Sequence, residues 1–61
     1  MYFVWRRNDG YIGCSNGRMP DGWRTTDGRD ISFEKLRESE DWEKCYEFMV
    51  RERRAVISWG A

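Results

Sequence analysis

The chain of 61 residues contains no histidine, so it lacks the commonest general base and one of the commonest metal ligands. A structural zinc site needs four Cys or His ligands, and two cysteines do not supply them, so we expect no metal. No Gly-x-Ser-x-Gly elbow or Gly-x-x-x-x-Gly-Lys-Ser/Thr loop is present. The carboxylates of Glu38–Glu47 are explained by a polar helix face. We therefore expect no enzymatic activity and no cofactor.

The chain also has no net charge, because eleven Lys and Arg residues balance eleven Asp and Glu residues. A neutral chain has no bulk electrostatic attraction to nucleic acid or to an anionic membrane. No apolar run approaches the roughly 18 residues of a membrane span, so we expect no membrane-spanning segment. The apolar run in Met1–Arg7 is too short for a secretion signal, and its arginines follow it. These features predict a cytoplasmic protein.

Aliphatic side chains are scarce, with three Ile, one Leu and three Val, whereas four Trp, three Tyr and three Phe supply ten aromatic rings. Disorder through low hydrophobicity also requires a large net charge and few aromatics, and neither condition holds here. We expect one folded domain over residues 1–61 with an aromatic-rich core. A chain this short buries only about 60% of the surface that it exposes when unfolded, so its stability is marginal. Marginal stability favours association with another chain.

Two cysteines, Cys14 and Cys45, permit a single disulfide. A cytosolic chain keeps its thiols reduced. We therefore favour two small buried hydrophobic side chains over the disulfide, which stays the alternative.

Glycine marks turns throughout the first thirty residues, in the pairs Asp9-Gly10, Asn16-Gly17, Asp21-Gly22 and Asp27-Gly28. The segments between these turns are rich in aromatic and β-branched residues, which predicts a three-stranded antiparallel meander of Tyr2–Arg7, Tyr11–Ser15 and Trp23–Thr26. Asn8-Asp9-Gly10 closes the first hairpin, either as a three-residue loop with Gly10 left-handed or as a two-residue turn, and the choice sets the register.

The first strand carries large apolar groups on both faces, with Phe3 and Trp5 on one side and Tyr2 and Val4 on the other. A sheet with water on one side normally alternates apolar and polar residues. Both faces of this sheet therefore need a cover.

Glycine and proline are absent between Ile31 and Ser58, and helix-forming residues dominate. Phe33 and Leu36 fall on the opposite side of a helical projection from the later apolar residues. This conflict predicts a short helical turn over residues 33–38 capped by Ser32, a break near Ser39, and a main helix over about residues 40–54. The segment Ala55–Trp59 suits either helix or strand, and we favour a helix that continues to about residue 57.

These elements predict an α+β fold, in which an N-terminal antiparallel meander of about three strands packs against a C-terminal helix. The apolar stripe of that helix should consist of Trp42, Cys45, Tyr46 and Met49. It should meet the sheet at Val4, Ile12 and Cys14 or at their neighbours on the opposite face.

Arginine and aromatic residues alternate in the sheet half, where residues 1–29 have a balance of +2 charges and residues 30–61 have −2. Protein interfaces are enriched in Trp, Tyr, Phe, Met and Arg. We therefore expect a non-enzymatic protein that binds another protein as an inhibitor or accessory factor. The candidate binding residues are Trp5, Arg7, Tyr11, Trp23 and Arg24.

The alternative is a binder of single-stranded nucleic acid or of a nucleotide, because Arg binds phosphate and aromatic rings stack on bases. The same surface would serve either function. We also expect a homodimer, because the sheet face that the helix leaves open needs a cover.

Overall fold

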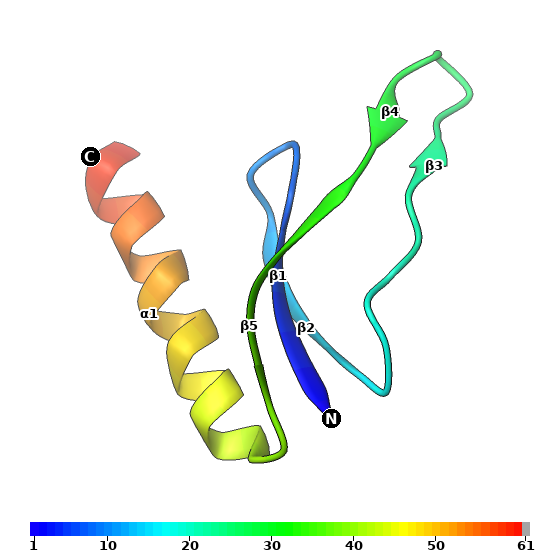
Figure 1. Ribbon diagram of the computed structural model, residues 1–61. Coiled ribbons are helices and arrows are strands. Elements are labelled where there is room, and N and C mark those ends of the chain that lie inside the picture. The colour runs from blue at the N-terminus through cyan, green and yellow to red at the C-terminus, as the bar shows by residue number, and fades with distance from the viewer. Residues whose placement is uncertain (61) are drawn as a thin grey trace.

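A computed structural model describes the backbone of residues 1–60 and the side chains of residues 1–55. Its elements are, in chain order, β1 (Tyr2–Arg7), β2 (Ile12–Asn16), β3 (Trp23–Arg24), β4 (Asp30–Ile31), β5 (Phe33–Ser39) and α1 (Trp42–Gly60) (Figure 1). The main sheet is antiparallel with the order β2-β1-β5, and β3 and β4 form a separate two-stranded sheet. A three-stranded sheet with one C-terminal helix confirms the predicted α+β class.

The helix and the second sheet lie on opposite sides of the main sheet (Figure 1). We call residues 17–32, which include β3 and β4, the arm. Within the described residues, no helix is long and apolar enough to cross a membrane.

The β1–β2 hairpin follows the first of its two predicted turns. The N–H of Gly10 donates to the carbonyl of Arg7 at 2.9 Å, and the N–H of Arg7 donates to the carbonyl of Tyr11 at 2.7 Å. Gly10 has a φ of 99°, which a residue with a Cβ rarely adopts, so the loop has three residues with Gly10 left-handed. The resulting register pairs Val4 with Cys14 and Trp5 with Gly13.

The third strand of the sheet is β5, not Trp23–Thr26, and the predicted helical turn over residues 33–38 is wrong. A local preference for helix is overridden here, because β5 pairs along the whole length of β1. Pairing as a strand sends Phe33 and Leu36 to opposite faces. Phe33 contacts Trp5, and Leu36 packs against the core beneath the helix. A bulge interrupts the register between Val4 and Trp5.

The predicted strand over Trp23–Thr26 is reduced to Trp23–Arg24, which pairs with β4 instead of β2. Thr25 starts a turn in which its carbonyl accepts from the N–H of Gly28 at 3.1 Å. The N–H of Thr25 donates to the carbonyl of Arg29 at 2.8 Å. This tight turn makes the segment a hairpin of its own, so it does not continue the meander.

Helix α1 begins at Trp42, close to the predicted start, and its backbone is helical to Gly60. The Asp41 carboxylate accepts from the N–H of Glu43 at 3.0 Å, and the Ser39 hydroxyl accepts from the N–H of Asp41 at 3.0 Å. These bonds satisfy donors that the first turn leaves without helical partners. The helical prediction for Ala55–Trp59 is confirmed over the strand alternative.

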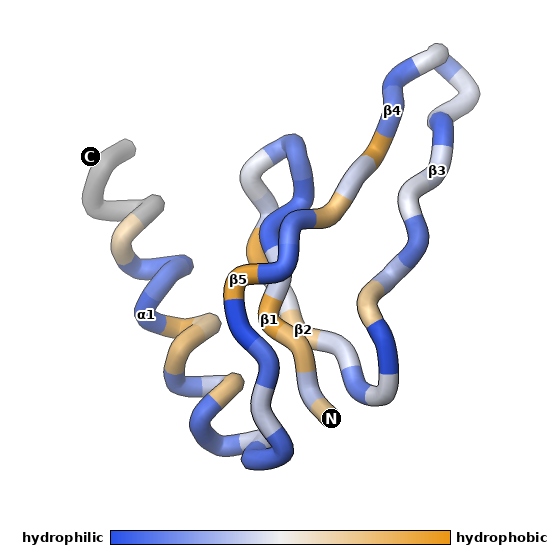
Figure 2. The backbone as a smooth tube through the Cα atoms, in the orientation of Figure 1, coloured by the Kyte–Doolittle hydropathy of each residue, from blue (hydrophilic) through white to orange (hydrophobic). Residues whose placement is uncertain are grey.

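The core lies between α1 and the sheet and consists of Val4, Ile12, Cys45 and Met49, with Tyr2, Cys14, Leu36, Phe48 and Val50 packed around it. In Figure 2 the most hydrophobic positions lie along the strands at the centre of the molecule. The predicted helix stripe is right for Cys45 and Met49. It is wrong for Trp42 and Tyr46, which are 45% and 50% exposed, because both lie on the flank of the helix once Cys45 faces the sheet.

Both cysteines are free thiols, so the disulfide is not formed. Cys45 is fully buried, and the Cys14 sulfur lies 3.4 Å from the sulfur of Met49. The cysteines therefore pack at the helix–sheet boundary, as the sequence predicted.

Candidate binding surface

The sheet face opposite α1 carries a cluster of aromatic side chains. Strand alternation sends Val4 into the core and the next residue, Trp5, to the other face. There the ring of Trp5 meets the ring of Phe33 edge-on, with 4.9 Å between the ring centres. The centre of the Phe33 ring lies 5.6 Å from the ring centre of Trp23 in the arm. The ring centre of Tyr11 lies 6.0 Å from that of Trp5. We call these four residues the aromatic face.

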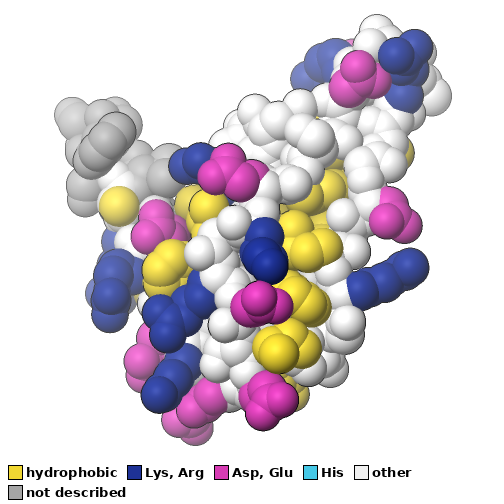
Figure 3. All heavy atoms as spheres, viewed as in Figure 1, with side chains coloured by type: hydrophobic (Ala, Val, Ile, Leu, Met, Phe, Trp, Pro, Cys, Tyr) yellow, Lys and Arg dark blue, Asp and Glu magenta, His cyan; other side chains and the backbone are white. Residues whose placement is uncertain are grey.

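The aromatic face is open to solvent at its ends. Trp23 and Tyr11 are 50% and 49% exposed, whereas Trp5 and Phe33 are half-buried between them. Figure 3 shows hydrophobic side chains gathered between the sheet and the arm, in the middle of that view. Exposed aromatic groups gathered in this way are typical of binding surfaces.

Trp5 forms the floor of this surface. Its ring lies over Gly13, where an added Cβ would come within 2.7 Å of Trp5 Cη2. Its indole Nε1 is buried and has no hydrogen-bond partner among the described residues. Trp5 is therefore as much a part of the packing as of the surface.

Arg7 is held beside the aromatic face by Asp9. Its guanidinium donates to both carboxylate oxygens, at 2.8 and 2.7 Å, and lies 5.0 Å from the centre of the Tyr11 ring. The bond from Arg7 is the largest cause of a lowered Asp9 pKa, about 2 against an ordinary value of 3.8. A backbone bond from Tyr11 adds to the effect.

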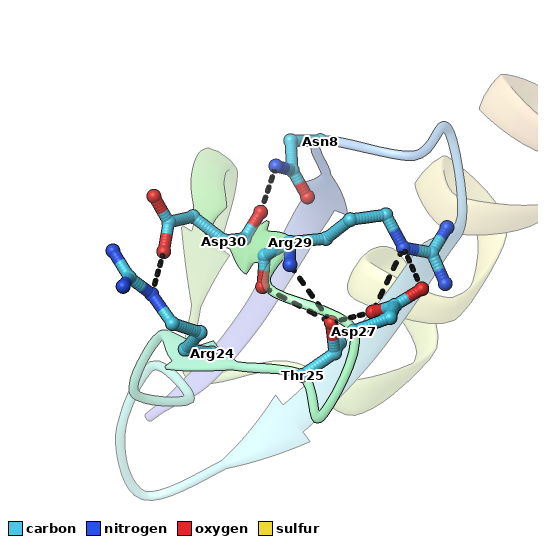
Figure 4. Close-up of polar contacts among 6 residues, drawn as sticks. All are labelled: Asn8, Arg24, Thr25, Asp27, Arg29 and Asp30. Atoms are coloured by element: carbon cyan, nitrogen blue, oxygen red, sulfur yellow. Dashed lines mark hydrogen bonds and ion pairs between the residues drawn. The ribbon is translucent and has the colours of Figure 1, made fainter.

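Arg24 lies in the arm, where it forms an ion pair with its cross-strand partner Asp30 at 3.0 Å (Figure 4). Beside it, Thr25 donates to Asp27, which also pairs with Arg29 at 3.1 Å. The four charged side chains of these two ion pairs are largely exposed. These contacts link the two sides of the hairpin at the tip of the arm.

Asn8 ties the arm to the β1–β2 hairpin. Its amide donates to the carbonyl of Asp30 at 2.6 Å (Figure 4), and its backbone N–H donates to the carbonyl of Ser32 at 3.0 Å. The N–H of Ser32 donates back to the side-chain oxygen of Asn8 at 3.3 Å. This residue therefore positions Trp23 and Arg24 relative to the sheet.

The structure thus places Trp5, Arg7, Tyr11 and Trp23 on one side of the sheet and Arg24 on the adjoining arm. Sequence reasoning missed Phe33, because that residue was assigned to a helical turn. It also missed Arg53 of α1, which donates to the Tyr11 hydroxyl at 3.1 Å and lies 5.2 Å from the centre of its ring. Only the pairing of β5 with β1, which no local sequence pattern displays, brings Phe33 to this face.

Carboxylates neutralise most arginines of the sheet half. Within the described residues, the ion pairs of these arginines are Arg6–Glu34, Arg7–Asp9, Arg24–Asp30 and Arg29–Asp27. A hollow of about 330 Å³ between the hairpin and the arm is lined by Asp9 and Asp30 as well as by Arg29. An incoming phosphate would have to displace carboxylates at each of these places.

Among the described residues, no three His, Cys, Asp or Glu side chains lie together as a metal site requires. No protein-family model matches the chain, and neither a curated protein nor a solved structure is significantly similar to it. The aromatic face and its charges are therefore the features of the molecule that indicate a function.

Proposed function

We propose that this chain is a non-enzymatic binding protein that docks onto another protein through the aromatic face, as an inhibitor or accessory factor in the cytoplasm. The observation that carries the proposal is the aromatic face itself, with its two half-exposed rings on a floor of two more. Free thiols fit a reducing compartment.

Four of the five candidate residues have a distinct role in this proposal. Trp23 is the anchor, since a half-exposed indole on a packed ring buries a large apolar area when a partner covers it. Trp5 and Phe33 support it. Arg7 and Arg24 form a polar rim, because each guanidinium is already oriented by a carboxylate.

The second candidate function is binding of single-stranded nucleic acid or of a nucleotide. Stacked aromatic rings beside guanidinium groups favour it. The ion pairs that neutralise Arg7, Arg24 and Arg29 favour a protein partner instead. Binding to phosphates should weaken steeply as salt rises, so fluorescence anisotropy with a labelled oligonucleotide at low salt separates the two functions. We expect no binding.

Capture of partners by the immobilised chain tests the proposal with two matched variants. Trp23→Ala removes a half-exposed indole from the aromatic face, and Trp42→Ala removes an equally exposed indole from the helix flank. Proteins retained by the wild type should be lost with Trp23→Ala and kept with Trp42→Ala. Equal retention by both variants, or loss only with Trp42→Ala, would contradict the proposal.

Self-association was expected because one sheet face needed a cover. In the structure, the chain's own arm lies over part of that face through the contact of Trp23 with Phe33. A homodimer therefore stays a proposal. The surface that favours it is not this sheet face but an edge of the main sheet, which is described in the next subsection.

A further inference from the structure

The two edges of the main sheet differ in how they are protected. Four of the seven residues of β5 are charged, and a bulge interrupts its pairing with β1. Charges and bulges are the usual means by which proteins block a sheet edge. The other edge strand, β2, has the sequence Ile-Gly-Cys-Ser-Asn and carries no charge and no proline. β2 is the edge open to another strand.

The hairpin bonds show which backbone groups of β2 point outward. Arg7 bonds to Tyr11, and Gly17 donates to the carbonyl of Met1, so odd-numbered residues of β2 face β1. In an antiparallel ladder the alternate residues then point away from β1. The N–H and C=O groups of Ile12, Cys14 and Asn16 therefore point outward.

Arg53 closes one end of this edge. Its Nε donates to the carbonyl of Ile12 at 2.8 Å. Among the described residues, no comparable bond covers the outward groups of Cys14 and Asn16. The open stretch is therefore short and centred on Ser15.

An apolar flank of α1 lies along the same edge. Trp42, Tyr46 and Val50 recur at intervals of four, on the side of the helix from which Arg53 reaches Ile12. Trp42 and Tyr46 are about half-exposed, and their ring centres lie 6.1 Å apart. Val50 and Tyr46 both line a hollow of about 360 Å³. Trp42 also packs on Tyr2 of β1, but among the described residues nothing covers the exposed halves of Trp42 and Tyr46.

We propose that a second copy of this chain pairs its β2 antiparallel with this β2, about a two-fold axis at Ser15. The two main sheets then form one continuous sheet, with the two α1 helices antiparallel on the same face. Cys14 pairs with Asn16 of the second copy, which satisfies their outward groups. The aromatic face lies on the other side of the sheet and stays open, so this proposal is independent of the proposed function.

The helix flank is complementary to itself under that symmetry. Tyr46 lies nearest the axis, since Cys45 lies beside Cys14, so Tyr46 meets its own copy and Trp42 meets Val50 of the second copy. The acidic residues at and just before the start of α1 then approach the basic residues of the later turns of the other helix. The acidic residues are Glu40, Asp41 and Glu43, and the basic ones are Arg51 and Arg54. Opposite charges at both ends favour a second copy over an unrelated strand.

Cross-linking at the axis tests the register. Residues that face each other without mutual hydrogen bonds lie with Cα atoms about 4.5 Å apart, a distance that a disulfide spans. Ser15→Cys should therefore form a covalent dimer under mild oxidation. Ser32→Cys is the matched control at an exposed position outside the edge. It and the wild type should stay uncross-linked, and equal cross-linking of both variants would overturn the proposal.

Sedimentation at tens of micromolar tests the dimer itself. The wild type should have twice the chain mass of 7.4 kDa. Asn16→Pro removes an outward N–H and no hydrogen bond to β1, so it should give the monomer mass with an unchanged circular dichroism spectrum. Tyr46→Arg, which places two like charges at the axis, should do the same and serves if proline perturbs the fold. A monomeric wild type would overturn the proposal, as would dimers of folded Asn16→Pro and Tyr46→Arg.

Discussion

The ring of Trp5 lies directly over the backbone of Gly13, so that an added Cβ would sit 2.7 Å from Trp5 Cη2. The two residues are register partners on neighbouring strands, which fixes their separation. Gly13 is thus the residue that lets the indole lie flat against the sheet.

Gly13→Ala should therefore destabilise the fold by about 1–3 kcal/mol, the usual cost of overpacking. Urea denaturation followed by circular dichroism measures this change. In a double-mutant cycle, the smaller ring of Trp5→Phe should reduce the penalty of Gly13→Ala. Additive effects of the two substitutions would show that the contact does not govern this face.

Val4 is fully buried at the centre of the helix–sheet core. Val4→Ala should lower the free energy of unfolding by about 2 kcal/mol, because it leaves a cavity under α1. Thermal unfolding of the two proteins measures the loss. Phe3→Ala, on the opposite face of the same strand, is the comparison, and a larger loss there would place the main core on the wrong side of the sheet.

Acid should weaken the contact between Arg7 and Asp9. The folded-state pKa of Asp9 is lowered to about 2 from 3.8, so its stabilising contribution is present above the ordinary value and is lost as pH falls toward about 2. The stability difference between wild type and Asp9→Asn should therefore shrink over that range of pH. It is measured by urea denaturation at a series of pH values.

Asp21→Asn is the control for this titration, because Asp21 is exposed and forms no ion pair among the described residues. Its difference from the wild type should not follow the same curve. A constant difference for Asp9→Asn across the acid range would mean that the guanidinium contact contributes nothing to stability.

Thiol labelling should report on the core. Cys45 is fully buried, and burial raises the pKa of the Cys14 thiol, so less of the reactive thiolate is present at neutral pH. Iodoacetamide near pH 8 should label the folded chain at least about tenfold more slowly than the urea-unfolded chain. Mass spectrometry follows both sites. Labelling of Cys45 at the unfolded rate would contradict the packing of α1 on the sheet.

Much of the fold followed from local signals. The turn residues Asn8-Asp9-Gly10 and the alternation in β1 predicted the hairpin, and the change of composition after Ile31 predicted a helix at the C-terminus. The candidate residues Trp5 and Arg7 share one side of the sheet, because alternation along a strand is a local property.

The errors arose where distant pairing decides the structure. Residues 33–38 have helix-forming side chains, yet they pair with β1 because its second edge and second face require a partner. Because β5 takes the place predicted for Trp23–Thr26 in the main sheet, Trp23 and Arg24 lie in the arm and Phe33 lies in the aromatic face. Trp42 was misplaced because a helical projection cannot show which part of a broad apolar stripe faces the sheet.

The most direct test of a binding role for the aromatic face is the indole N–H spectrum of the ¹⁵N-labelled chain during titration with a captured partner. We predict that the signals of Trp23 and Trp5 shift or broaden on binding, whereas the signal of Trp42 on the far side of the sheet does not. A change confined to Trp42, with Trp23 and Trp5 unaffected, would contradict the account.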